Sequence, residues 1–107
     1  MSSVLRSMER VVRPPGGKTL EIALQLDDGC RVSQVSITGD FFVYPPEALE
    51  ALEDALRGCS STSCITKAVR QTAERAEALG FTWSQLAAAL TRMYDEACSA
   101  PSSRQPP

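Results

Sequence analysis

The alternating stretch at residues 18–26, KTLEIALQL, constrains the fold of this chain more than any other feature. Leu20, Ile22, Leu24 and Leu26 occupy every second position, and the residues between them are polar or small. Because successive side chains of a strand point to opposite faces, the pattern predicts a half-buried β-strand. A strand of this kind needs a second layer that covers its apolar face.

Turn-forming residues flank this strand on both sides. The sequence PPGG at residues 14–17 precedes it, and Asp27-Asp28-Gly29 follows it, with Gly29 free to adopt positive φ. A weaker strand pattern covers residues 4–13, and alternation resumes at residues 31–38. Connections this short predict an antiparallel three-stranded meander.

The rest of the chain has helical periodicity. A first helix is expected after Pro45-Pro46 and ends at Gly58, and a second is capped by the Ser/Thr cluster at 60–63 and ends at Gly80. A third begins at a T-x-x-Q capping box formed by Thr82 and Gln85. The inward stripes are Leu49, Leu52 and Leu56; Ile65, Val69, Thr72, Ala76 and Leu79; and Leu86, Leu90, Met93 and Ala97.

The order βββααα predicts an α+β fold, in which a three-stranded antiparallel sheet carries about three helices on one face. With 107 residues the chain is expected to form a single domain, residues 1–107, that buries a core without help from metal or disulfides. The Pro/Ser-rich tail from about residue 99 to 107 is expected to be frayed.

Charge and hydropathy exclude several classes of protein. Eleven basic and thirteen acidic residues are interspersed and leave a net charge of -2, so no nucleic-acid partner is expected. No apolar run approaches the roughly 20 residues that a membrane span needs, and no signal-peptide pattern is seen at the N-terminus. We therefore expect a cytoplasmic protein that binds no membrane.

The four cysteines show no metal-binding spacing. Cys30, Cys59, Cys64 and Cys98 include no C-x-x-C pair, and the chain has no histidine, so no zinc site is expected. One interpretation makes Cys64 and Cys98 small buried apolar residues and Cys30 a turn residue. A Cys59–Cys64 disulfide is also sterically conceivable, although it would be unusual in a reducing cytoplasm.

No catalytic constellation is recognisable. The absence of histidine excludes the ordinary Ser-His and Cys-His pairs, and the carboxylates of the first helix are expected on its solvated side: Glu47, Glu50, Glu53 and Asp54. Gly17-Lys18-Thr19 matches the end of a phosphate-binding loop, but it opens a strand where such a loop opens a helix. Any activity would therefore depend on a partner, unless a lone Cys or Asp is unusually activated.

The junction GDFFVYPPEAL, residues 39–49, carries three aromatic rings where small polar residues are usual. Packing beneath the first helix is one explanation for each ring. Alternation prevents Phe41 and Phe42 from both pointing inward, so at least one ring is left for the surface. Tyr44 is expected to keep solvent access, Gly39 to need a backbone conformation closed to other residues, and Asp40 to form an Asx turn.

The string Val35-Ser36-Ile37-Thr38-Gly39-Asp40-Phe41-Phe42, followed by a helix that begins in prolines and by Leu56-x-Gly58, resembles the C-terminal accessory domain of lipoate-protein ligases. The preceding hairpin fits the same pattern. The resemblance covers roughly residues 4 to 98 and is greatest to the archaeal form, in which this domain is a separate small chain.

The resemblance implies a non-catalytic subunit that forms a heterodimer with a large catalytic subunit. The large subunit would bind lipoate, ATP and magnesium, form lipoyl-adenylate and serve lipoyl carrier domains, whereas this chain would hold no cofactor or metal. The motif residues expected to bind the partner are Gly39, Asp40, Phe41, Phe42 and Tyr44.

Two alternatives stay open. Sulfur-acceptor and iron-sulfur scaffold proteins share a small sheet with helices on one side, but they place a cysteine in the loop where this chain has Asp40. An unrelated adaptor module that uses the same aromatic residues is the other alternative, because a fold does not determine a function.

Overall fold

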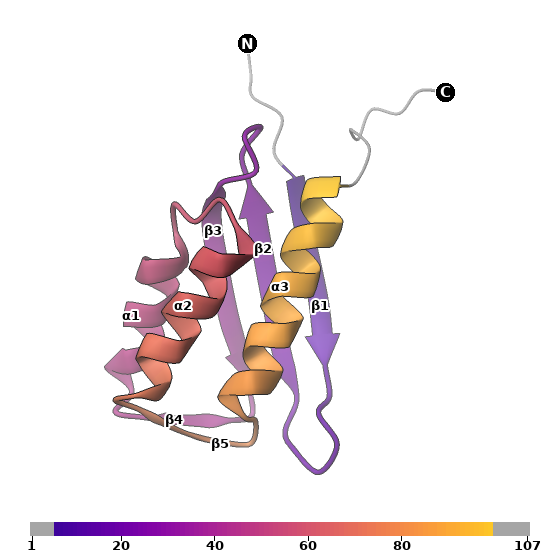
Figure 1. Cartoon of the computed structure of the whole chain (residues 1–107). Helices are drawn as coiled ribbons and strands as arrows, with labels where there is room; N and C mark the ends of the chain where they lie inside the picture. The colour runs from indigo at the N-terminus through magenta and orange to yellow at the C-terminus, as the bar shows by residue number, and fades with distance from the viewer. Residues whose placement is uncertain (1–5, 100–107) are drawn as a thin grey trace.

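The computed structural model describes residues 6–99 and packs three helices against one face of an antiparallel sheet (Figure 1). The elements follow in the order β1 (Arg6–Val12), β2 (Leu20–Leu26), β3 (Val32–Gly39), β4 (Phe42–Tyr44), α1 (Glu47–Leu56), α2 (Thr62–Ala73), β5 (Glu77–Leu79) and α3 (Trp83–Ser99). The predicted α+β class, with a three-stranded sheet followed by three helices, is therefore confirmed. The predicted frayed tail lies outside the described residues, except for Ser99, which ends α3.

The main sheet is the predicted meander, with strand order β1-β2-β3. Leu24 pairs with Met8 on one side and with Val35 on the other, and the register shifts between Gln25 and Leu26. The second turn is present as predicted, and the residue with positive φ in it is Cys30, at 58°, and not Gly29. Residues 4 and 5 of the predicted first strand lie outside the described residues.

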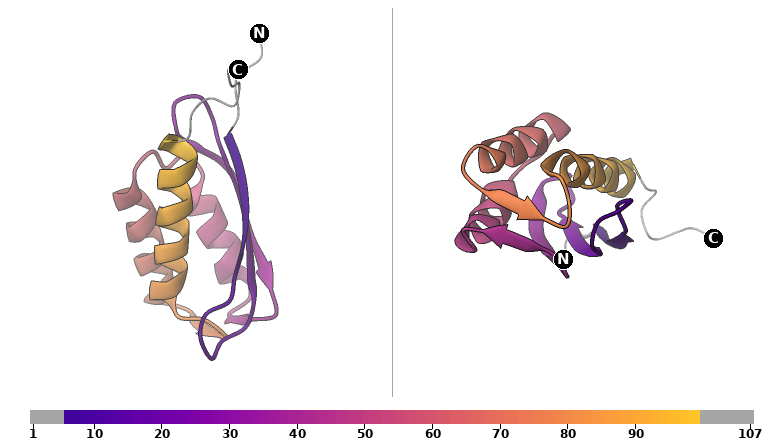
Figure 2. Two further views of the ribbon diagram at one scale, coloured as in Figure 1. Left: turned by 90° about the vertical axis from the view of Figure 1, so that its right-hand side faces the viewer. Right: turned by 90° about the horizontal axis from the view of Figure 1, so that it is seen from below.

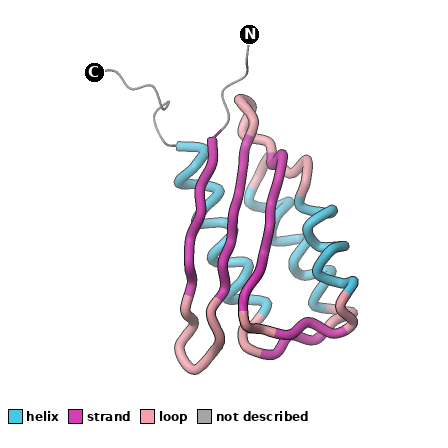
Figure 3. Tube along the Cα trace, turned by 180° about the vertical axis from the view of Figure 1, so that it is seen from behind, coloured by secondary structure: helices cyan, strands magenta, loops and turns pink. Residues whose placement is uncertain are grey.

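The helices cover only one face of the main sheet, as the side view in Figure 2 and the view from behind in Figure 3 show. The inward positions of β2 are almost fully buried, as the alternation predicts, and Leu52, Leu86 and Leu90 of the helices belong to the same buried core. Burial of this apolar surface, worth about 25 cal/mol per Å², holds the layers together.

The helix ends follow the predicted caps. Thr82 and Gln85 exchange hydrogen bonds, because the Gln85 N–H donates to Thr82 Oγ1 at 3.0 Å and the Thr82 N–H donates to Gln85 Oε1 at 2.9 Å. Ser61 caps α2 by accepting from the Cys64 N–H. One prediction for α1 was wrong: Glu53 is not simply solvated, since its carboxylate accepts the Ile37 N–H at 2.9 Å on the edge of β3.

The prediction of a helix up to Leu79 was also wrong. α2 ends at Ala73, and residues 77–79 form β5, which pairs with β4 in a separate two-stranded sheet. The helical spacing of Ala76 and Leu79 suits a helix, but pairing with β4 satisfies the backbone of this segment through tertiary contacts. We call the two-stranded sheet of residues 42–44 and 77–79 the ribbon.

Candidate partner-binding ribbon

The ribbon has one buried and one exposed face. In its antiparallel register Phe42 lies opposite Leu79, Val43 opposite Ala78, and Tyr44 opposite Glu77. Side chains alternate between the faces of a strand, so Phe42 and Tyr44 point to the same side. Phe42 is 66 % exposed, Tyr44 69 % and Leu79 67 %, whereas Val43 is buried.

These three side chains account for three of the four large apolar residues that are exposed within residues 6–99; the fourth, Val11, lies on β1. Phe42 and Leu79 are directly cross-strand, where side chains are close enough to form one continuous apolar surface. Apolar side chains that cluster on a protein surface form a candidate contact site for another macromolecule.

The ribbon is fixed to the main sheet at the end where β4 begins and β5 ends. The Lys18 N–H donates to Gly80 O at 2.7 Å, which joins the β1–β2 turn to the end of β5. The Asp40 N–H donates to Thr19 O at 3.2 Å, which holds the entry to β4 beside β2. The exposed rings are therefore presented from a supported backbone.

Phe41 points the other way from Phe42 and is partly buried. Its ring meets the buried ring of Phe81 edge to face, with centroids 5.1 Å apart, and Phe81 in turn meets Trp83 at 5.3 Å. This aromatic row supports the ribbon from inside, because edge-to-face pairs add about 0.5 to 1.5 kcal/mol to the burial of their area.

Gly39 and Asp40 have backbone roles at this junction. Gly39 has φ of 151°, and a Cβ there would lie 2.1 Å from Thr19 O, so its backbone conformation is closed to other residues as predicted. The predicted Asx turn is not seen, because within residues 6–99 the exposed carboxylate of Asp40 accepts no hydrogen bond. An Asx turn occurs instead at Asp27, which accepts from the Gly29 N–H at 2.9 Å.

The structure thus places the predicted rings at one end of the molecule. Phe42 and Tyr44 lie on the exposed face of the ribbon, and Phe41 points the other way and is partly buried. The structure adds Leu79, which sequence reasoning assigned to the inward stripe of a helix. The missed signal is the short run Glu77-Ala78-Leu79 before Gly80, which alone is too short to be distinguished from a helix end.

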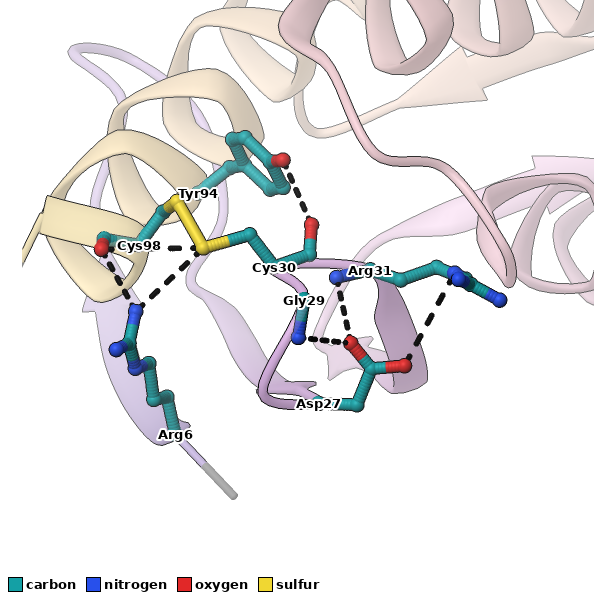
Figure 4. Close-up of a disulfide and its surroundings, with 7 residues drawn as sticks. All are labelled: Arg6, Asp27, Gly29, Cys30, Arg31, Tyr94 and Cys98. Atoms are coloured by element: carbon teal, nitrogen blue, oxygen red, sulfur yellow. Dashed lines mark hydrogen bonds and ion pairs between the residues drawn. A yellow bond between two sulfur atoms is a disulfide. The ribbon is translucent and has the colours of Figure 1, made fainter. Parts of the chain in front are cut away.

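The four cysteines form two disulfides, Cys30–Cys98 and Cys59–Cys64, so no free thiol is present. The interpretation of Cys64 and Cys98 as small buried apolar residues was therefore wrong, and the conceivable Cys59–Cys64 pair is formed. The other disulfide ties the β2–β3 turn to the end of α3 (Figure 4).

Hydrogen bonds surround the Cys30–Cys98 disulfide. The Tyr94 hydroxyl donates to Cys30 O at 2.7 Å, and Arg6 donates to Cys98 O at 2.7 Å (Figure 4). Burial of the ring, with the nearby charges of Asp95 and Asp27, raises the pKa of Tyr94. The hydrogen bond from the Arg31 N–H lowers the pKa of Asp27 most; desolvation opposes it, and the Gly29 N–H and the charge of Arg31 lower this pKa further.

The residues described include neither a candidate metal site nor a membrane-spanning helix. Within residues 6–99, no group of three or more His, Cys, Asp or Glu side chains is arranged to hold a metal ion. None of the helices described is long and apolar enough to cross a membrane.

Comparison with known proteins points to one system. No family model matches the chain. A stretch of 41 residues is 44 % identical to lipoate-protein ligase A subunit 2 of Thermoplasma acidophilum, and this stretch is 38 % of the present chain and 43 % of that protein. The aligned region thus spans less than half of the relative's length.

The fold matches over a larger part of the chain. A chain from the structural analysis of an archaeal lipoylation system, a bipartite lipoate protein ligase and its E2 lipoyl domain from Thermoplasma acidophilum, superposes with a TM-score of 0.64 and 27 % identity. The superposition covers 83 % of the present chain and 97 % of that chain. In sequence and in fold, therefore, the protein is similar to the accessory subunit of an archaeal split lipoate-protein ligase, which confirms the resemblance carried by its ITGDFF motif.

Proposed function

We propose that this chain is the non-catalytic accessory subunit of a split lipoate-protein ligase. With a large catalytic subunit it would support the ATP-dependent activation of lipoate to lipoyl-adenylate, before transfer to lipoyl carrier domains. The observation that carries the proposal is that this chain superposes on 97 % of the archaeal chain. The exposed aromatic side chains of its ribbon support a role in binding a partner. Lipoate, ATP and magnesium would all bind to the large subunit.

The physical role proposed for the chain is to cover the active site of the catalytic subunit. An acyl-adenylate is prone to hydrolysis, and a cover that excludes water protects such an intermediate. The ribbon suits the contact because Phe42, Tyr44 and Leu79 lie on one rigid face, and aromatic side chains are frequent anchors of interfaces.

The cysteine arrangement disfavours the sulfur-acceptor and iron-sulfur alternative. Such proteins need a thiolate to carry sulfur or to bind iron, and all four cysteines here are joined in disulfides. A cytoplasmic location stays part of the proposal, and disulfides are common in that compartment chiefly in hyperthermophiles.

The test combines this chain with the large subunit of a split lipoate-protein ligase that lacks the domain. We expect lipoate-dependent release of pyrophosphate from ATP when both chains are present, and none above background with this chain alone. Adenylate formation by this chain alone would contradict the accessory role. No stimulation and no complex with the large subunit of the same organism would favour the adaptor alternative.

Variants of the ribbon test which surface meets the partner. Phe42→Ala, Tyr44→Ala and Leu79→Ala remove exposed side chains, so the melting temperature should stay near wild type. Binding to the large subunit should weaken by about 2 kcal/mol for at least one of them. Val11→Ala is the matched control, since Val11 is 54 % exposed but lies on β1. Equal binding by all four variants would place the partner elsewhere.

A further inference from the structure

A second surface feature lies between β1, the β1–β2 turn and α3. It is a groove of about 330 Å³ whose floor is apolar, with Val12, Pro14 and Ala89 among its lining residues. Three arginines, Arg10, Arg13 and Arg92, also line it, and no acidic side chain does. We call this feature the arginine groove.

The positive charge of the groove is largely unneutralised. Arg10 is paired with Glu96 at 2.6 Å, but within residues 6–99 neither Arg13 nor Arg92 forms an ion pair. The whole chain has a net charge of -2, so this local positive charge runs against its overall balance. Two exposed guanidinium groups above an apolar floor are complementary to carboxylates that flank an apolar side chain.

The groove lies at the same end of the molecule as the ribbon. One of its walls is Pro14-Pro15 in the β1–β2 turn, and this turn is bonded to the end of β5 through the Lys18 N–H and Gly80 O. Figure 1 shows the turn and the ribbon side by side at the lower end of the molecule. The groove and the ribbon are therefore neighbouring surfaces at this end of the molecule.

We infer that the arginine groove docks an acidic segment of the same partner that covers the ribbon, with an apolar side chain of that segment on the groove floor. The inference rests on the proposed function, because the partner is the catalytic subunit proposed above. The ribbon would supply the apolar part of the contact. The groove would supply charge complementarity, which sets the association rate and the salt dependence of binding.

The first measurement is the affinity of the full chain for the large subunit at 50 and 300 mM NaCl. The double variant Arg13→Gln/Arg92→Gln should bind about tenfold more weakly at low salt and should lose most of the salt dependence. The matched control is Lys67→Gln/Arg70→Gln, which removes the same charge from exposed positions on α2. An affinity and a salt dependence equal to those of the control would overturn the inference.

A second measurement does not need the catalytic subunit, so it separates failure of the groove from failure of the proposed function. An acetylated hexapeptide of alternating glutamate and leucine is titrated into the full chain at 50 mM NaCl, with the glutamine analogue as its control. We expect NMR shifts of Ala88 and Ala89, which line the groove, with the acidic peptide only, and their loss in Arg13→Gln/Arg92→Gln. No shift at millimolar peptide, or equal shifts with both peptides, would overturn the inference.

Discussion

Gly39 ends β3, and its conformation decides how the chain passes from the main sheet into the ribbon. Its φ of 151° is rare for residues with a side chain, and the Thr19 carbonyl lies where a Cβ would be placed. Gly58 also has positive φ, at 93°, but has no atom within 4 Å of the corresponding position. Comparing substitutions at the two glycines therefore separates the cost of backbone strain from the cost of a steric clash.

We predict that Gly39→Ala lowers the free energy of unfolding by about 1 to 3 kcal/mol, because strain and a backbone contact act together. Gly58→Ala should cost about 1 kcal/mol, because only the conformational preference is lost. Urea unfolding of both variants provides the measurement. Equal losses would show that the approach to Thr19 contributes nothing.

For single residues, the sequence predicts burial best where the alternation of a strand determines which face a side chain occupies. The opposite burial of Phe41 and Phe42 follows from the period of a strand, and the need for glycine at position 39 follows from the sharp exit of the chain. The left-handed backbone of Cys30 could not be predicted, because the adjacent Gly29 is the residue that ordinarily adopts it. Hydrogen bonds within the turn accompany this geometry, since the Cys30 N–H donates to Asp27 O at 3.0 Å and the Asp27 N–H donates to Arg31 O at 2.9 Å.

The ribbon is the element that sequence patterns did not reveal. Its strands are three residues long and are separated by α1 and α2. Neither local periodicity nor a hairpin turn therefore predicts their pairing. The main sheet, by contrast, has seven- and eight-residue strands joined by short turns, and the helices have long stripes and caps. The length of these strands and helices, and the short turns between the strands, explain why those elements could be predicted.

The two faces of β4 should respond differently to truncation. Val43 is buried between two exposed aromatic residues, so Val43→Ala should lower the free energy of unfolding by about 1 to 3 kcal/mol through the cavity it leaves. Phe42→Ala should change it by less than about 0.5 kcal/mol. Thermal and urea unfolding of the two variants compare these effects. A larger loss for Phe42→Ala would mean that its ring belongs to the core.

The two disulfides and the proposed binding surface lie at opposite ends of the molecule. Cys30 lies in the β2–β3 turn, and Cys59 follows α1, where its carbonyl accepts the Val32 N–H at 2.8 Å. Both disulfides thus lie at one end of the sheet, and Figure 1 shows the ribbon at the other end. Stability and partner contact should therefore be separable by changing the cysteines.

The two disulfides should contribute unequally to stability. In the chain-entropy view a cross-link restricts the unfolded state more when it closes a longer loop. The separation of 68 residues between Cys30 and Cys98 corresponds to about 4 kcal/mol, and the separation of 5 between Cys59 and Cys64 corresponds to about 2 kcal/mol. Cys30→Ser/Cys98→Ser should accordingly lower the urea midpoint more than Cys59→Ser/Cys64→Ser does.

Neither double variant should weaken binding to the large subunit at a temperature where it is still folded, because neither touches the ribbon. Dithiothreitol added to the wild type should reproduce the sum of the two stability losses, and it should leave the serine variants less affected. Equal losses for the two pairs would contradict the loop-length explanation. Weaker binding by a folded variant would instead show that the disulfide end shapes the partner surface, and that the two ends of this small domain are coupled through the main sheet.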